Sequence, residues 1–424
     1  MRHVERSDRA RRRVHPADSG PRHALRAALL AFAALAGPAW AEPVPLKLWH
    51  SYTHTEREGL DAALAAFAAK HADIAVEASY VPYDALTDKL TAAIPRGHGP
   101  DVFIFAHNRL GGWAEGGLVA PIELYVDEPL LDRHLYACVM ALAYKGSLYG
   151  LPLAHKALAL YVRTDRVAKA PTTFEELLAA AKASTDPKNQ RYGLVYPNAD
   201  FFFHTPLMHS LGGLVYDGES AVPDVRNPGM ERSLALAKRL AKEEALLPDD
   251  PTSVLSASMF SEGRTPLVIS GPWMRAEIDR GVPYTVVPLP AFPGGQAASG
   301  YSTCEGVIMS GKSTHKKQAF QLMEFLSSEP EGAAPRMKIG GQTVTLQSVW
   351  PTTLATLDEG ERAIFSAFQE AFRRSVPSPI WPSMNAVWVP MNAALYKTLH
   401  QDMDPHAALE EAQKRIEKGL GGGG

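Results

Sequence analysis

The stretch Gly99-Pro-Asp-Val-Phe-Ile-Phe-Ala-His-Asn-Arg-Leu-Gly-Gly-Trp-Ala-Glu-Gly-Gly-Leu118 is the most informative part of this chain of 424 residues. Val102 to Phe105 form a short apolar run, which predicts a strand buried on both faces. The polarity changes at Ala106-His107-Asn108-Arg109, and a short helical segment around Trp113 then ends at a glycine pair. Ligands of open α/β sheets bind just outside the carboxyl ends of strands. The amide and the guanidinium placed there offer planar groups that suit hydroxyl-rich ligands.

The first 41 residues are typical of an export signal. Arginines run from Arg2 to Arg26, an apolar core follows from Ala27 to Gly37, and Ala39-Trp40-Ala41 fits an A-x-A cleavage site. The apolar core is too short for a permanent membrane helix. We therefore expect a signal peptide over residues 1–41 and an exported, periplasmic protein from Glu42 onward.

The remainder, about 380 residues, is long enough for two or three domains. The chain has 43 Lys and Arg against 46 Asp and Glu, a formal net charge of −3. This balance indicates neither nucleic acid nor an anionic membrane surface as a partner.

The sequence leaves the state of Cys138 and Cys304 open. An oxidising compartment would allow them to pair, but the sequence does not bring them together. Two buried free thiols are the favoured interpretation, and a disulfide is the alternative.

Short apolar runs alternate with helical patterns along the chain, which indicates an α/β fold. Strands are expected at residues 46–49, 74–81, 102–105, 193–196, 266–269, 284–287 and 306–309. Helices are expected at residues 56–71, 84–94 and 316–327, with a further one after the threonine cap at Thr173. Residues 149–163 are interpreted as an extended crossing segment, and the Pro- and Gly-rich residues 288–300 as a second connection.

One segment, Gly306-Val-Ile-Met-Ser-Gly311-Lys312-Ser313, matches the phosphate-loop pattern. Its central residues are strand residues, whereas a phosphate loop needs a flexible backbone there. The preceding run, Tyr-Ser-Thr-Cys-Glu, is too mixed for the apolar strand that should come first. We interpret the segment as a strand followed by a helix, and not as a nucleotide site.

His50 and His54 are four residues apart, a spacing that suits a metal only when both lie on one helix. They follow a predicted strand, so we assign no metal and keep two alternatives, the rim of a ligand pocket and a solvated loop. The chain has no Gly-x-Ser-x-Gly elbow and no Cys-x-x-Cys pair. Nothing in the sequence points to a catalytic residue.

The aromatic residues favour a binding site. A pyranose has an apolar face and a polar rim, so a sugar site needs rings for the face and planar polar groups for the rim. Trp273 follows Ser270-Gly-Pro directly after a predicted strand. A lone tryptophan belongs more often to a core than to a ligand site, so its motif decides the interpretation.

Three further motifs accompany the opening stretch. Met259-Phe260-Ser-Glu-Gly263 precedes Ser270-Gly-Pro-Trp273, Asn385-Ala-Val-Trp388 lies towards the C-terminus, and Glu123 to Gly150 runs into Leu-Pro-Leu-Ala. With these motifs the chain resembles the family 1 extracellular solute-binding proteins, from about Leu46 to about Lys418. It is similar in particular to the maltose- and maltodextrin-binding proteins, the capture subunits of ABC sugar importers.

The resemblance implies an α/β, two-lobed periplasmic-binding-protein fold of type II. Each lobe should be a central mixed sheet flanked by helices, with the ligand cleft between the lobes. On this pattern residues 42–153 and 291–351 form the N-lobe, residues 154–290 and 352–420 the C-lobe, and residues 421–424 a disordered tail. The chain should cross between the lobes near residues 153–157, residues 287–290 and Thr352.

The resemblance also implies a set of ligand-binding residues and no catalytic ones. The set is Trp273, Arg109, Asn108, Phe105, Trp388, Phe202, Thr53, His54, Lys156, Asn392 and Asp200. Several depart from the family's pattern: Asn108 replaces an aspartate, Thr53 and His54 an Asp-Lys pair, Lys156 a glutamate, and Asn392 an arginine. Fewer carboxylates then hold sugar hydroxyls. We therefore expect a sugar other than maltose as the preferred ligand, and Lys156 would even suit a partly anionic one.

We accordingly expect a monomeric binding protein without a metal or cofactor. It should capture its sugar by hinge closure and deliver it to the inner-membrane permease subunits of an ABC importer. The alternative is an exported hydrolase or lyase that acts on oligosaccharide in a similar cleft.

Overall fold

The apolar run from Val102 forms strand β3 (Val102–Ala106), whose five residues are all buried at the centre of a six-stranded sheet. The strand order is β12-β11-β3-β1-β2, and β6 also pairs with β11. The bounds are β1 (Val44–His50), β2 (Ile74–Tyr80), β6 (Gly150–Lys156), β11 (Tyr301–Met309) and β12 (Val376–Pro377). Strands β1, β2 and β3 are parallel, and β11 runs antiparallel to both β3 and β6.

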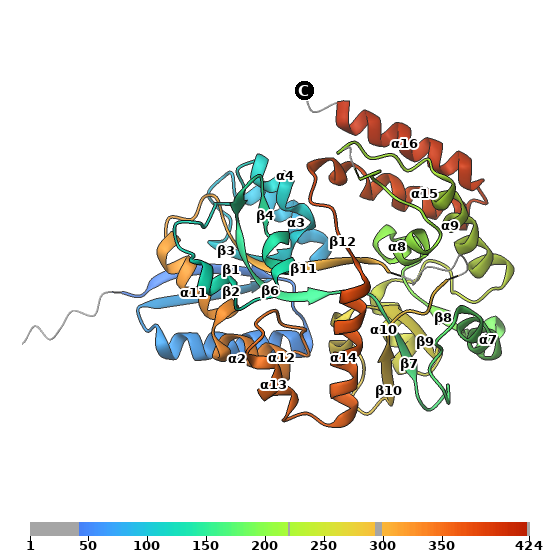
Figure 1. The fold of residues 1–424 in the computed structure, drawn as a ribbon, viewed down its shortest axis with the longest axis horizontal. Coiled ribbons are helices and arrows are strands. Elements are labelled where there is room, and N and C mark those ends of the chain that lie inside the picture. The colour runs from blue at the N-terminus through green and yellow to red at the C-terminus, as the bar shows by residue number, and fades with distance from the viewer. Residues whose placement is uncertain (1–41, 219–220, 293–298, 422–424) are drawn as a thin grey trace, which may run out of the picture. The chain divides into compact units, whose positions relative to one another are not determined.

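A second sheet contains four strands in the order β10-β7-β9-β8. They are β7 (Ala159–Arg163), β8 (Leu194–Val195), β9 (Leu267–Ser270) and β10 (Tyr284–Val287). Strand β6 points from the first sheet towards the second, and only Ala157 and Leu158 separate it from β7 (Figure 1). The predicted crossing segment is therefore a pair of strands, one in each sheet.

The computed structural model describes residues 42–218, 221–292 and 299–421. The predicted signal peptide over residues 1–41 lies outside the described residues, as does most of the predicted tail. Gly421, which the sequence assigned to that tail, is instead the last residue of helix α16 (Pro405–Gly421). Within the described part of the chain, no helix combines the length and the apolar character needed to cross a membrane.

Helices cover both sheets. The core of the first sheet includes buried residues of α2 (His54–Lys70), α3 (Tyr83–Ala93) and α11 (Lys316–Ser328), and α12 (Pro330–Lys338) packs against α2. The core of the second includes residues of α7 (Phe174–Ser184), α10 (Ser253–Ser261) and α14 (Glu359–Arg374). A separate cluster joins α8 (Phe201–Ser210), α9 (Pro228–Lys238), α15 (Trp388–His400) and α16.

Shorter elements complete the fold. They are α4 (Leu110–Glu115), α5 (Glu128–Leu131), α6 (Tyr136–Ala141), α13 (Val349–Leu354), β4 (Ala143–Tyr144), β5 (Ser147–Leu148), the 3₁₀ turns η1 (His107–Arg109), η2 (Pro187–Asn189), η4 (Pro272–Ala276) and η5 (Pro382–Ala386), and the π-helical η3 (Arg239–Glu243).

The prediction of free thiols is wrong. Cys138 on α6 and Cys304 on β11 form a disulfide, with their Cα atoms 5.2 Å apart. Both cysteines are buried, and 166 residues separate them in the sequence. Their pairing depends on α6 packing against β11, a tertiary contact that no local pattern reveals.

The segment that matches a phosphate loop lies in β11. Gly306 to Met309 form its second half and are buried, as the strand interpretation requires. The view that no strand precedes Gly306 is wrong, because Tyr301 to Glu305 form the first half of the same strand. That half contains polar residues, so its sequence looked too mixed for a strand, but these residues are buried.

Candidate functional site

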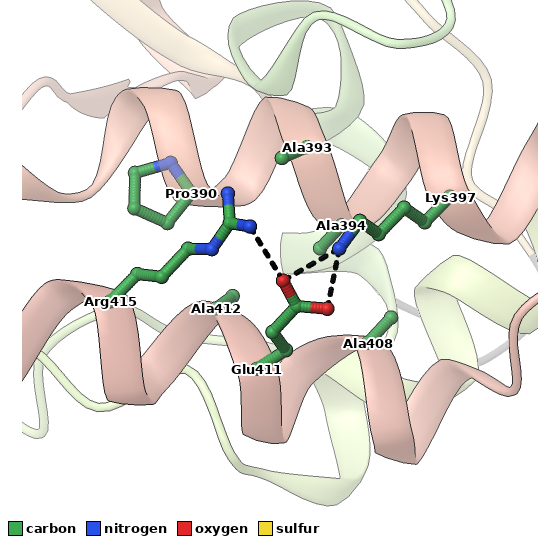
Figure 2. Close-up of a pocket in the computed structure, with 8 residues that line it drawn as sticks. All are labelled: Pro390, Ala393, Ala394, Lys397, Ala408, Glu411, Ala412 and Arg415. Atoms are coloured by element: carbon green, nitrogen blue, oxygen red, sulfur yellow. Dashed lines mark hydrogen bonds and ion pairs between the residues drawn. The ribbon is translucent and has the colours of Figure 1, made fainter.

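Two surface pockets contain none of the nominated residues. Figure 2 shows one of them, a seam between α15 and α16 that is too narrow to admit a water molecule. The carboxylate of Glu411 on α16 bridges the seam to Lys397 Nζ on α15, 2.5 Å away, and also lies 2.7 Å from Nη2 of Arg415 on its own helix (Figure 2). This seam is a helix-packing contact. A second groove, along α9 and η3, likewise contains none of the nominated residues.

Trp273 lies in η4, immediately after β9. Pro272 occupies the first position of this turn, where its fixed φ favours the helical conformation. The carbonyl of Gly271 accepts a hydrogen bond of 2.7 Å from the hydroxyl of Tyr161, which anchors the turn to β7. The indole is partly buried, and its ring centre lies 6.4 Å from that of Phe202 and 6.3 Å from that of Phe203. The chain thus forms an aromatic group at the end of a buried strand.

Lys156, at the end of β6, lies next to this group. Its ammonium is 6.0 Å from the ring centre of Trp273 and 5.6 Å from that of Tyr52. It donates a hydrogen bond of 2.9 Å to Glu305, and it lies 3.8 Å from Glu56. The hydroxyl of Tyr52 donates to the other oxygen of Glu305. All four polar side chains are buried or nearly so.

The charges in this cluster support one another. Burial alone would lower the pKa of Lys156, but the negative charges of Glu305 and Glu56 outweigh it and raise that pKa. Burial raises the pKa of Glu56, and the nearby ammonium of Lys156 opposes the rise. The lysine is therefore a paired cation, although the sequence suggested a positive charge available to an anionic ligand.

Asn108 and Arg109 lie where β3 gives way to η1. Arg109 donates a hydrogen bond of 2.8 Å to the side chain of Asn385 in η5. Burial lowers the pKa of Arg109. The side-chain oxygen of Asn108 is buried and has no hydrogen-bond partner among the described residues. These two groups are thus a cation held by a neutral amide, and an acceptor with unused capacity.

Phe105 is buried at 3 % exposure, and the ring of Tyr83 stacks on it with 4.9 Å between centres. Tyr83, which the sequence did not nominate, is 51 % exposed and so presents the outer ring of this stack. Partial burial raises the pKa of its hydroxyl.

The charges of four different elements act on that hydroxyl. Lys156 and Arg109 lower the pKa of Tyr83, whereas Glu305 and Asp200 raise it. These charges come from η1 directly after β3, the end of β6, the middle of β11 and the start of α8.

The start of α8 is built from three of the nominated residues. Asp200 caps the helix, because its carboxylate accepts the backbone N–H of Phe202 at 2.8 Å. Asn392 on α15 accepts the N–H of Phe201, also at 2.8 Å. Burial raises the pKa of Asp200 from 3.8 to about 6, against the effect of the Phe202 N–H, and Asp84 raises it further.

Three nominated residues remain: Trp388, Thr53 and His54. Trp388 is 8 % exposed within the α8, α15 and α16 cluster, its ring packed edge-on against Phe201 at 5.9 Å. Its indole N–H has no partner among the described residues. Thr53 begins α2 without a side-chain cap, and His54 is exposed with φ of 44°. His50 is buried at the end of β1.

Sequence reasoning missed several polar members of the site. They are Tyr52, Glu56, Tyr83, Glu305 and Asn385. Glu305 was hidden because the mixed run around it argued against a strand, and Tyr83 because a tyrosine at a helix start carries no motif. Within the described residues, no group of three or more His, Cys, Asp or Glu side chains could hold a metal ion.

Comparison with known sequences identifies the family. Residues 62–356, well over half of the chain, match the family described as bacterial extracellular solute-binding protein. The chain belongs to this family.

Several relatives match most of this chain. A maltotriose-binding protein of Pyrococcus abyssi is 28 % identical over 88 % of this chain and 82 % of its own. A galactooligosaccharide-binding protein of Bacillus subtilis is 26 % identical over 84 % and 85 %. A relative from Streptococcus pneumoniae, 24 % identical over 78 % of this chain and 79 % of its own, is named a maltooligosaccharide ABC transporter solute-binding lipoprotein.

Solved structures of such proteins have the same fold. The Thermus thermophilus maltotriose-binding protein, with maltotriose bound, aligns with a TM-score of 0.79 at 23 % identity over 88 % of this chain and all of its own. A cyclo/maltodextrin-binding protein in complex with maltotetraose aligns with a TM-score of 0.72 at 27 % identity over 90 % and 98 %. The two mixed sheets described above therefore form the two-lobed, type II periplasmic-binding-protein fold, as the sequence predicted.

Proposed function

We propose that this protein is the periplasmic, monomeric substrate-binding protein of an ABC importer and that it captures a sugar, a maltodextrin-like oligosaccharide or a related carbohydrate. Its family is one of extracellular solute-binding proteins. Its relatives are named for maltotriose, galactooligosaccharide and maltodextrin. Residues 1–41 would direct its export.

The observation that carries the proposal is the position of Trp273 over Lys156, with 6.0 Å from the ammonium to the ring centre. The indole, with Phe202 beside it, offers an apolar surface for a sugar face. Polar groups lie beside it: Lys156 is paired with Glu305, and Asp200 caps the helix that carries Phe202. A ring beside planar polar groups is the composition that a sugar site needs.

We propose that binding closes a hinge. The N-lobe would comprise residues 42–153 and 291–351, and the C-lobe residues 154–290 and 352–420. The first crossing would follow β6, which belongs to the first sheet as far as Lys156. A ligand that touches both lobes only in the closed state favours that state. The closed form would then dock on the permease subunits.

Isothermal titration of the purified protein with a panel of sugars tests the proposal, together with product analysis after long incubation. We expect saturable binding of at least one oligosaccharide and its recovery intact. Turnover of a bound sugar would instead support the alternative of an exported hydrolase or lyase. Absence of binding to every member of the panel would contradict the proposal.

A thermal-shift screen tests the substrate class. Stabilisation by a ligand rises with the ratio of its concentration to its dissociation constant. Because Asn108, Thr53 and Lys156 replace carboxylates of the family's pattern, we expect a neutral oligosaccharide other than maltose or maltotriose to give the largest shift. Sugar acids should gain little, since Lys156 is already paired with Glu305 and Glu56. A largest shift with maltose or maltotriose would show that these substitutions do not redirect specificity.

A further inference from the structure

Arg275, two residues after Trp273 in η4, contacts both the turn after α12 and helix α14. It donates a hydrogen bond of 3.2 Å to the carbonyl of Gly341, in the turn that follows α12. Its other terminal nitrogen donates to Glu361 on α14, and its guanidinium lies 4.9 Å from the ring centre of Phe365. The side chain is only 10 % exposed. The guanidinium is therefore largely shielded from water, unlike that of a surface ion pair.

The turn at Gly341 leads directly to the lysine cluster. The next residue, Gln342, is buried, and its amide donates a hydrogen bond of 3.3 Å to Glu56, the second carboxylate beside Lys156. Thr343 then exchanges hydrogen bonds with the backbone of His155 on β6, one residue before that lysine. Movement of this turn would therefore displace Glu56 and the end of β6, and with them the surroundings of Lys156.

Trp273 and Arg275 share one short turn. Trp273 faces Lys156 at 6.0 Å, and Arg275 holds the turn that contacts Glu56. The contacts form a closed circuit: from Lys156 to Trp273, along η4 to Arg275, across to Gly341 and Gln342, and back through Glu56 to Lys156.

We propose that Arg275 is a positioning residue for the ligand site: by bridging η4 to Gly341 and Glu361 it fixes Trp273 over Lys156. The proposal rests on the proposed function, in which Trp273 is the sugar platform. Lysine cannot replace Arg275 fully, because the carbonyl and the carboxylate are bound by two separate nitrogens of a rigid guanidinium, and lysine has a single nitrogen.

The first test needs no ligand. Hydrogen exchange is compared between the wild-type protein, Arg275→Met and the matched control Arg280→Met, which changes an exposed arginine five residues further on. We expect faster exchange in Arg275→Met at the amides of Met274 and Glu277, which close η4, and at Gly341. Unchanged protection at these amides would overturn the proposal. If Arg275→Met does not fold, Glu361→Gln, which weakens one end of the same bridge, is measured in its place.

The second test is a double-mutant cycle read by titration with maltotriose. If Arg275 acts through Trp273, Arg275→Met should weaken binding about tenfold in the wild-type background and hardly at all in Trp273→Ala. Arg275→Lys should recover part of the loss. Equal losses in both backgrounds would show a merely structural role and overturn the proposal.

The two tests separate this proposal from the proposed function. A protein that binds no sugar of the panel contradicts the proposed function. In that case hydrogen exchange at η4 and Gly341 still decides whether Arg275 holds the turn.

Discussion

The indole of Trp273 folds back over Gly271, so that a Cβ added at Gly271 would lie 2.0 Å from Cζ3 of the ring. The backbone of Gly271 has φ of −99°, which any residue can adopt, so the glycine is needed for space and not for conformation. The Gly-Pro-Trp motif thus has a physical explanation. Proline starts the turn, the small residue admits the ring, and the ring presents its outer face.

Gly271→Ala should therefore act like a loss of the tryptophan. The new methyl group forces the rigid indole out of its position over residue 271, and we expect maltotriose affinity to fall roughly 5- to 150-fold, which corresponds to about 1–3 kcal/mol. Titration calorimetry measures the loss. Gly421→Ala, at the end of α16 with nothing within 4 Å of the added Cβ and no left-handed backbone, is the control for a glycine change that leaves the ring alone. Unchanged affinity in Gly271→Ala would mean that the ring relaxes without effect on the ligand.

Trp273→Ala should lower affinity and spare the fold. Removing the indole takes away the surface that covers the sugar face, at a cost of about 1–3 kcal/mol in binding. The ring of Trp273 is partly exposed, whereas Trp350 lies in the core at 9 % exposure. The melting temperature of Trp273→Ala should therefore fall less than that of Trp350→Ala. Melting curves and titrations are measured on both variants. A large fall in melting temperature with unchanged affinity would place Trp273 in the core.

Local pattern was sufficient for most of the fold. The apolar run at Val102 forms β3, and Thr173 caps α7 by accepting the N–H of Glu176, as the sequence indicated. These elements depend on residues adjacent in the chain. The first half of β11 was missed because a strand that buries Glu305 against Lys156 does not look apolar.

The site was harder to predict because it depends on contacts between distant segments. Trp273 was nominated through its motif, whereas Tyr83 joins the candidate site only because α3 brings it onto Phe105. Trp388 shows the reverse case, since a motif nominated a ring that the structure packs in a helical cluster. The resemblance locates the family's positions in the sequence. The residues that contact those positions come from distant segments, which the sequence does not bring together.

Lys156→Met should destabilise the protein more at pH 8 than at pH 5. Its removal leaves Glu305 and Glu56 buried without their cation, a change worth about 3–5 kcal/mol in comparable cases. Burial already raises the pKa of Glu56, and loss of the ammonium raises it further. When the folded pKa of a carboxyl is raised, the protein loses folding stability as the pH rises through the range between the unfolded and the folded pKa. At lower pH the carboxyl is protonated and this cost is smaller.

Urea denaturation of Lys156→Met at both pH values measures this effect. The double variant Lys156→Met/Glu305→Gln is the control, because it removes one of the stranded charges and should recover part of the stability. An equal loss of stability at pH 5 and pH 8 would contradict the prediction, because it would show that the two carboxylates become hydrated in the variant.

Loss of the disulfide should destabilise the first sheet. The bond closes a loop of 166 residues between α6 and β11, and its removal should cost about 2–5 kcal/mol. We compare melting of the wild-type protein with and without a phosphine reductant, and of the variant with Cys138→Ala and Cys304→Ala. The variant should melt lower and show no response to reductant. A wild-type protein that melts at the same temperature in both conditions, and together with the variant, would contradict the prediction.

Asp200→Asn should become progressively more stable than the wild-type protein as the pH rises from 4 to 7. Burial raises the pKa of Asp200 from 3.8 to about 6, so the folded state holds the proton more tightly than the unfolded chain does. Ionisation at the folded site therefore costs stability between about pH 4 and pH 6, up to about 3 kcal/mol in total. Asparagine keeps an acceptor for the N–H of Phe202 and does not titrate. Denaturation at pH 4, 5, 6 and 7 measures the difference, and Asp358→Asn, at the exposed cap of α14, controls for the loss of one carboxylate. Parallel curves for Asp200→Asn and the wild-type protein over this range would show that Asp200 ionises without penalty.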